Sequence, residues 1–383
     1  MSIDKERLNK GLWFVGGQRT ADKKLKQVLE PEQLDDVKDT KFVIEKGGKY
    51  MNGVGFDIGT GNIVSARKAE DGKIITTCER DAFIFLGKWD EVQNKLSRSS
   101  VSYTKIDDKA YVIGNAAYKH ANVFGNVELR RPMAFGMLNP TEKEALPIIK
   151  EIFSSVLGPP QCEKEVCCFV TPSEPIDIES YVIYHEDVVK AIVESLGYTA
   201  VNIKEGVALA YAGLVDEELT GLSLSFGAGM LNVCVMYEGL DCLNFSITKT
   251  GDWIDTNASR DVDIPIAHIT AIKEDPEFDL LKTGGSREVK AIISYYRFVI
   301  RNVLTQIAHL FNTSTGMPYF KNPVKIVCGG GTASAKGFVE IFQQEYDKLD
   351  FPINIKAIEV IDEPLYAVAK GALSEALLTA ERK

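Results

Sequence analysis

The apolar and polar positions of this chain follow two periods, one typical of strands and one typical of helices. Strand-like alternation surrounds a glycine-containing turn in Val54–Ser65 and again in Leu222–Val235. A looser alternation runs from Ile74 to Leu86, and Tyr103–Tyr118 reads as two strands around a turn at Asp107-Asp108. Continuous apolar runs predict buried strands at two further places, Cys167–Thr171 and Val324–Gly331.

Helical spacing separates these strands. Apolar residues recur on one face of Thr141–Val156, and a second helix is expected from Asp177 to Leu196, ending at Gly197. A long helix should begin after Ser286, because a serine there can accept a hydrogen bond from a first-turn amide. Its apolar stripe from Val289 to Leu310 predicts core packing. Alternating strands and helices of this kind predict an α/β fold.

Size and composition narrow the class of protein. The chain has 383 residues, a net charge of −10 and 45% hydrophobic residues, which suits a globular protein with two cores and disfavours non-specific nucleic-acid binding. No stretch resembles a signal peptide, and no apolar run approaches the ~20 residues that span a bilayer. The seven cysteines lack a Cys-x-x-Cys spacing. We therefore expect a cytoplasmic protein with reduced thiols and no zinc site.

The two glycine turns carry the candidate chemistry. Gly59 and Gly61 follow Asp57, and Gly227 and Gly229 stand at the matching positions of the second turn. Glycine lets backbone amides approach an anion closely, and a carboxylate at a strand end can hold a hydrated metal ion. Each turn alone is also compatible with an ordinary β-hairpin. Their recurrence indicates a duplicated fold with a phosphate-binding clamp between its halves.

Together with Val327–Thr332, these turns resemble the three nucleotide-binding motifs of the actin-like ATPase superfamily, which includes actin, heat-shock chaperone ATPases and sugar kinases. The resemblance spans roughly residues 50–380 and is closest to bacterial actins of the MreB, MamK and ParM type. It implies two related actin-like (ribonuclease-H-like) domains with a nucleotide cleft between them. We expect an N-terminal extension over 1–50, domain I over 51–200 and domain II over 201–383, with the C-terminus returning to domain I.

The same resemblance implies a site for ATP or ADP with Mg²⁺. Asp57 would hold the metal, and Glu205, in a segment like the connecting motif of these ATPases, would polarise the attacking water. The nucleotide-contacting positions would be Gly59, Thr60, Gly61 and Asn62; Ser225, Gly227, Ala228, Gly229, Met230 and Leu231; Lys273 and Glu274; and Gly329, Gly330, Gly331 and Thr332. Lys273 and Glu274 are equally consistent with a solvated helix face, as Arg131 is with a solvated loop.

Two departures from the superfamily pattern bear on catalysis. Asn62, Ile63 and Val64 stand where many relatives carry a basic residue. Ser225 replaces the aspartate of the second motif, and Met230-Leu231 lie where a hydroxyl is usual. Since serine supplies no carboxylate, we expect nucleotide binding to persist and hydrolysis to be slow.

These expectations favour an ATP-dependent filament protein that assembles with copies of itself. An actin-fold adaptor that binds nucleotide with little turnover is the alternative, and a small-metabolite kinase shares the fold. The first 50 residues are rich in charge around the apolar group Leu12–Val15. That segment is consistent with a strap on the protein's own surface, or with a contact to a membrane surface or an adaptor protein. The sequence does not distinguish ATP from GTP.

Overall fold

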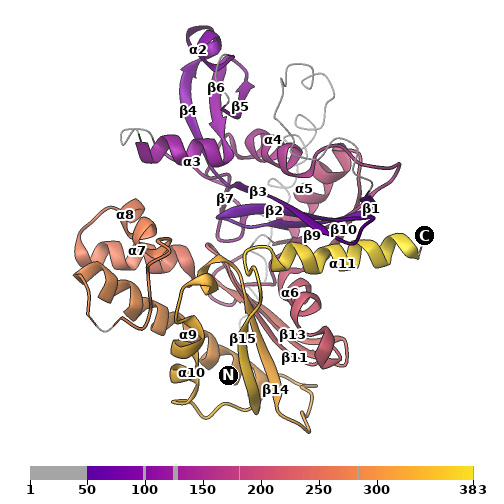
Figure 1. The fold of residues 1–383 in the computed structure, drawn as a ribbon, viewed down its shortest axis with the longest axis vertical. Coiled ribbons are helices and arrows are strands. Elements are labelled where there is room, and N and C mark those ends of the chain that lie inside the picture. The colour runs from indigo at the N-terminus through magenta and orange to yellow at the C-terminus, as the bar shows by residue number, and fades with distance from the viewer. Residues whose placement is uncertain (1–49, 98–100, 124–127, 181, 283, 383) are drawn as a thin grey trace, which may run out of the picture. The chain divides into compact units, whose positions relative to one another are not determined.

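A computed structural model describes residues 50–382 except 98–100, 124–127, 181 and 283 (Figure 1). The expected N-terminal extension and its apolar group Leu12–Val15 lie outside the described residues. Within the described part of the chain, no helix is long and apolar enough to cross a membrane.

The first half of the described chain carries ten strands and four helices. The strands are β1 (Tyr50–Ile58), β2 (Asn62–Ala69), β3 (Ile74–Arg80), β4 (Phe83–Lys88), β5 (Tyr103–Ile106), β6 (Lys109–Ile113), β7 (Met133–Ala134), β8 (Met137–Leu138), β9 (Val166–Thr171) and β10 (Thr199–Lys204). The helices are α2 (Trp89–Leu96), α3 (Gly114–Val123), α4 (Ala145–Leu157) and α5 (Val182–Ser195).

The second half begins with α6 (Glu205–Gly213) and a short 3-10 turn, η4 (Val215–Glu217). Its strands are β11 (Gly221–Phe226), β12 (Leu231–Tyr237), β13 (Leu240–Ile247), β14 (Val324–Gly329) and β15 (Ile355–Val360). Its remaining helices are α7 (Gly251–Val262), α8 (Ile266–Lys273), α9 (Arg287–Thr313), η5 (Gly331–Ser334), α10 (Phe338–Tyr346) and α11 (Ala367–Glu381).

Two five-stranded sheets have the same topology. The first sheet runs β10-β9-β1-β2-β3 and the second β15-β14-β11-β12-β13. In each, three consecutive strands pair antiparallel and two later strands add in parallel on the side of the first strand. The fold is therefore α/β with two halves of related topology, as the repeated glycine turns predict.

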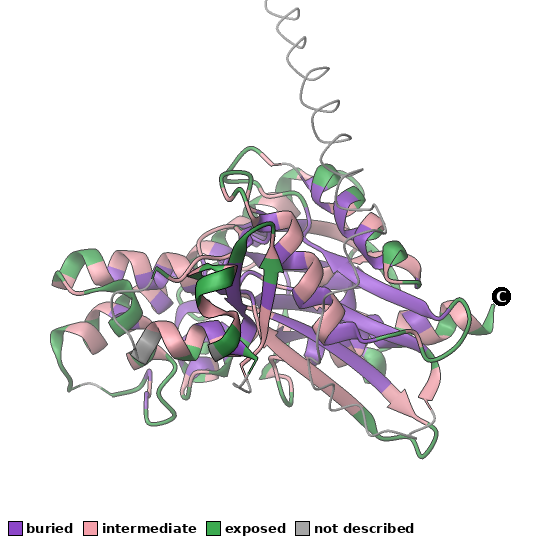
Figure 2. Cartoon of the chain, turned by 90° about the horizontal axis from the view of Figure 1, so that it is seen from above, coloured by how far each residue is buried: buried purple, intermediate pink, exposed green. Residues whose placement is uncertain are grey.

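Helices α6 and α11 connect the cores of the two sheets. Each follows the last parallel strand of its own sheet, and α11 packs on β1 and β9 of the first sheet although it follows β15 in sequence (Figure 1). Small residues allow the close crossing of these helices: a Cβ atom at Gly371 would overlap the Ala208 carbonyl oxygen. Figure 2 shows the strands of the sheets as the buried centre of the described chain.

The predicted elements are present, with changed boundaries. The predicted helical face of Thr141–Val156 is buried, and Ser286 caps α9 through the Val289 amide. The prediction that a helix begins at Asp177 was wrong, since α5 begins at Val182. The cause is that the carboxylate of Asp177 accepts hydrogen bonds from the backbone amide and hydroxyl of Thr248, which holds this segment beside β13.

Candidate functional site

The first glycine turn joins β1 to β2. The amide of Gly59 donates to the carbonyl of Asn62 at 3.0 Å, which closes a tight turn with Thr60 and Gly61 at its tip. The Thr60 side chain is buried, and its hydroxyl accepts a hydrogen bond at 2.8 Å from the amide of Gly136, between β7 and β8. The turn is therefore held by the β7–β8 hairpin as well as by its own strands.

The second glycine turn joins β11 to β12 and has the same internal bond, from the Gly227 amide to the Met230 carbonyl at 3.1 Å. The Gly227 carbonyl accepts from the hydroxyls of Thr250 at 2.8 Å and Thr332 at 2.9 Å. Thr250 precedes α7 and Thr332 belongs to the third glycine motif. The second turn, the start of α7 and the third motif thus meet at one carbonyl oxygen.

The tips of the two turns contact one another. A Cβ atom at Gly61 would lie 3.0 Å from the Cβ of Ala228, and one at Gly229 would overlap the Thr60 hydroxyl. A side chain at Gly229 would therefore prevent this approach, and one at Gly61 would fit only if Ala228 moved slightly. A phosphoryl group placed between the turns would need them to separate, so this structure shows a closed arrangement of the predicted phosphate clamp.

Asp57 and Glu205 interact at the base of the turns. Burial, and after it the charge of Glu205, raises the pKa of Asp57 well above its ordinary value. Burial also raises the pKa of Glu205 to about 7, while a hydrogen bond from Ser225 lowers it. Each carboxylate disfavours charge on the other, so a cation beside them would stabilise both in the charged form.

Asp57 and Glu205 are the residues of this site that could hold a metal ion. Among the described residues, no group of three or more His, Cys, Asp and Glu could hold a metal ion by itself. Mg²⁺, however, usually keeps several waters and is held by one or two carboxylates together with phosphate oxygens. Asp57 and Glu205 fit that mode of binding, in which the nucleotide would supply the remaining ligands.

Asn232 is a member of this cluster that the sequence analysis missed. It lies directly opposite Ser225 in the β11–β12 pair and is fully buried. Its side-chain amide donates to Glu205 at 2.7 Å, and its oxygen accepts from the Ser173 amide at 2.9 Å. In the sequence, Asn232 is a polar residue within an otherwise apolar strand. It stands opposite Ser225, which replaces the aspartate of the superfamily pattern.

Lys273 and Glu274 occupy the end of α8, but their side chains have separate partners. Lys273 pairs with Asp255 at 2.7 Å and donates to the Gly251 carbonyl at 3.1 Å. Glu274 instead binds Arg80, at the end of β3. Lys273 therefore lies beside the second turn, which it contacts by way of Gly251. The Glu274 side chain points toward the first sheet.

The third motif is shaped by backbone contacts. Gly330 has a φ of +85°, and a Cβ atom there would overlap the Phe226 carbonyl oxygen. Its amide donates to the Pro364 carbonyl at 2.8 Å. A Cβ at Gly251 would lie 2.6 Å from the Thr332 hydroxyl, so the loop packs closely against the start of α7.

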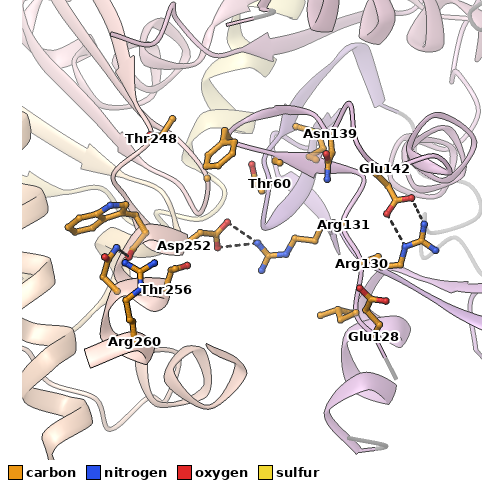
Figure 3. Close-up of a pocket in the computed structure, with 17 residues that line it drawn as sticks. Thr60, Glu128, Arg130, Arg131, Asn139, Glu142, Thr248, Asp252, Thr256 and Arg260 are labelled. Carbon is orange, nitrogen blue, oxygen red and sulfur yellow. Dashed lines mark hydrogen bonds and ion pairs between the residues drawn. The ribbon is translucent and has the colours of Figure 1, made fainter. Parts of the chain in front are cut away.

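A cavity of about 670 Å³ opens beside the turns, between the β7–β8 hairpin and α7 (Figure 3). Of the predicted site residues, Thr60 and Gly229 line it. Figure 3 shows Arg131 and Asp252 pointing toward one another across it. Their ion pair joins a guanidinium nitrogen to a carboxylate oxygen at 2.9 Å. The volume is within the range of small-molecule sites. The prediction for Arg131 left a solvated loop arginine open, and the structure instead gives it a carboxylate partner.

Solved structures with the same fold include bacterial actin-like proteins. A MamK double helical filament aligns with a TM-score of 0.63 and 15% identity, covering 84% of this chain and 98% of that chain. MreB5 of Spiroplasma citri bound to ADP aligns with a TM-score of 0.60 and 15% identity, covering 86% and 98%. The ethanolamine utilization protein EutJ from Carboxydothermus hydrogenoformans aligns with a TM-score of 0.50 and 18% identity, covering 93% and 98%.

These structural alignments, over most of each chain, show an actin-like fold of the MreB and MamK type. A search of curated protein sequences gave no match. One family model does match, and it spans residues 51–376, which include both glycine turns, the third motif and most of α11. The chain belongs to the Volactin family.

Proposed function

We propose that this protein is an actin-like filament protein that binds ATP or ADP with Mg²⁺ between its two glycine turns and hydrolyses ATP slowly. The observation that carries the proposal is the opposed pair of matching turns with the interacting carboxyl groups of Asp57 and Glu205 at their base. Backbone amides of the turns would bind the phosphates, and bound Mg²⁺ would neutralise part of their charge.

Glu205 is the residue with the right surroundings to polarise an attacking water. Its pKa of about 7 means that it can accept a proton near neutral pH. Asn232 donates to one of its oxygens at 2.7 Å and would fix the direction of the other. Ser225 offers a hydroxyl where the superfamily pattern has a carboxylate, and this is the reason to expect slow turnover.

Filament formation is supported by the architecture shared with MamK, one of whose solved structures is a double helical filament. We propose a division into domain I (51–200) and domain II (201–383), with α11 returning to the first sheet. In this arrangement the two domains of a subunit would open and close relative to one another. Residues 1–50 are proposed as the contact to a membrane surface or an adaptor.

The test is pelleting and negative-stain microscopy of the full chain with Mg-ATP, with Mg-ADP and without nucleotide. Filaments that depend on nucleotide would support the proposal. Monomers or small oligomers in all three conditions would contradict filament formation.

The closed contact between the turns favours a second candidate, an adaptor of the same fold that binds nucleotide with little turnover. Thr60 and Gly229 touch where a phosphoryl group would lie, and Ser225 lacks a carboxylate. Bound nucleotide without filaments would select this candidate. A small-metabolite kinase would be recognised by phosphorylated products when candidate sugars are supplied.

A further inference from the structure

Arg80 and Glu274 join the first sheet to α8. Both guanidinium Nη atoms donate to the carboxylate, at 3.1 and 3.0 Å. The Tyr118 hydroxyl donates to the same carboxylate at 3.3 Å, and the guanidinium stacks over the Tyr118 ring, 4.5 Å from its centre. Paired hydrogen bonds of this geometry fix direction as well as charge. The partners are 194 residues apart in sequence.

Arg131 and Asp252 form a second link of the same kind. One Nη atom of Arg131, just before β7, donates to both carboxylate oxygens of Asp252 in the first turn of α7, at 3.0 and 2.9 Å. The two side chains close over the cavity that Thr60 and Gly229 line (Figure 3). A carboxylate near a helix N-terminus is also favoured by the helix dipole, which helps to fix Asp252 in this place.

Both arginines belong to elements of the first sheet and its hairpin, and both carboxylates belong to helices packed in the core of the second sheet. The apolar residues Ile254 of α7 and Ile269 of α8 are fully buried in that core. In Figure 1, α3, α7 and α8 lie together at the left, away from α6 and α11. The two ion pairs therefore connect the halves on the side opposite the crossing helices.

We propose that Arg80–Glu274 and Arg131–Asp252 form an electrostatic latch that holds the glycine turns in contact, and that a phosphate-bearing ligand reaches the turns only when both pairs open. The entry of a nucleotide through this latch rests on the proposed function, whereas the latch itself does not. The four side chains are between 26% and 38% exposed, so each pair is partly screened by water and salt. Such a latch is weak enough to open reversibly.

The experiment measures hydrogen–deuterium exchange of the amides in the two turns, in the full chain without nucleotide. Arg80→Gln and Arg131→Gln are each expected to increase exchange at Thr60–Asn62 and Ala228–Met230 by about two- to fivefold, and the double variant by about tenfold. Added salt should increase exchange in the parent and have little effect on the double variant. Lys356→Gln is the control. It removes the ion pair between Lys356 and Glu217, which both belong to the second half and do not link it to the first.

Reversal of the second pair, with Arg131→Asp and Asp252→Arg combined, should give slower exchange than Arg131→Gln alone and so exclude a general loss of packing. The restoration should be partial, because the dipole of α7 disfavours an arginine at its N-terminus. Unchanged exchange in the double variant would overturn the latch, whether or not nucleotide binds. Faster exchange in a protein that fails to bind Mg-ATP would support the latch while refuting the proposed function. If Mg-ATP does bind, its association and dissociation should both accelerate in the latch variants, and identical rates in parent and variants would count against the latch.

Discussion

Replacing Asp81 with asparagine should remove a pH-dependent loss of stability. The Asp81 side chain is 1% exposed, and one of its oxygens accepts from the Met133 amide at 3.0 Å. The other oxygen has no hydrogen-bond partner among the described residues. Burial raises the pKa of this carboxyl to about 8, although the Arg131 charge opposes the shift. Asp81 is therefore protonated in the folded protein at neutral pH.

The sign and size of this pH dependence follow from the pKa of Asp81 in the folded and in the unfolded chain. In the unfolded chain an aspartate titrates near its ordinary pKa of about 3.9, so between about pH 4 and pH 8 the folded state holds a proton that the unfolded state has released. The free energy of unfolding then falls as pH rises, by at most about 1.4 kcal/mol per pH unit. At pH 7 the accumulated cost reaches up to about 4 kcal/mol relative to acid conditions.

The asparagine of the Asp81→Asn variant does not titrate, so the variant lacks this loss of stability with rising pH. Urea unfolding of parent and variant at pH 5, 6, 7 and 8 should show the variant gaining stability relative to the parent at each step. Asp187→Asn, at an exposed position of α5, is the matched control and should show no such trend. A difference between parent and Asp81→Asn that stays constant from pH 5 to pH 8 would refute the assignment of a protonated Asp81.

Three further changes test the crossing helices and the carboxylate site. Gly371→Ala should destabilise the fold by about 3 kcal/mol in urea unfolding, because the new methyl overlaps the Ala208 carbonyl oxygen, whereas Gly284→Ala has no atom within 4 Å and should be neutral. Glu205→Gln should abolish ATP hydrolysis while Asp57 still supports Mg-ATP binding, and the parent's rate should rise with pH and level off below about 7, because bound Mg²⁺ lowers the pKa of Glu205 from the value of about 7 that burial gives it. Ser225→Asp should speed hydrolysis by restoring a carboxylate, and turnover no faster than the parent's would count against the account of slow hydrolysis.

The fold could be predicted from the sequence because its main signals are local. The turn at Gly59–Gly61 and its repeat at Gly227–Gly229 are each specified by a few adjacent residues, and apolar periodicity marks the strands and helices around them. The shared topology of the two sheets follows from that repetition. Asp57 and Glu205 could be proposed from motif order, and the structure places their carboxyl groups close enough for the charge of Glu205 to raise the pKa of Asp57.

Other features could not be predicted, since they depend on residues far apart in sequence. Arg80 and Glu274 carry no pattern that predicts their pairing. The late start of α5 depends on a contact between Asp177 and Thr248, which local helical spacing does not reveal. The contact of Thr60 with Gly229 depends on how the halves close, a property of the whole fold.

The measurement that tests the central claim most directly is calorimetric titration of Mg-ATP into the full chain and into Gly61→Val. The valine side chain would project toward Ala228, into the space between the two turns. The account predicts saturable binding of one nucleotide per chain in the parent and loss of binding in the variant. Absence of binding in the parent, or equal binding by both proteins, would contradict the claim that the two glycine turns form a nucleotide site.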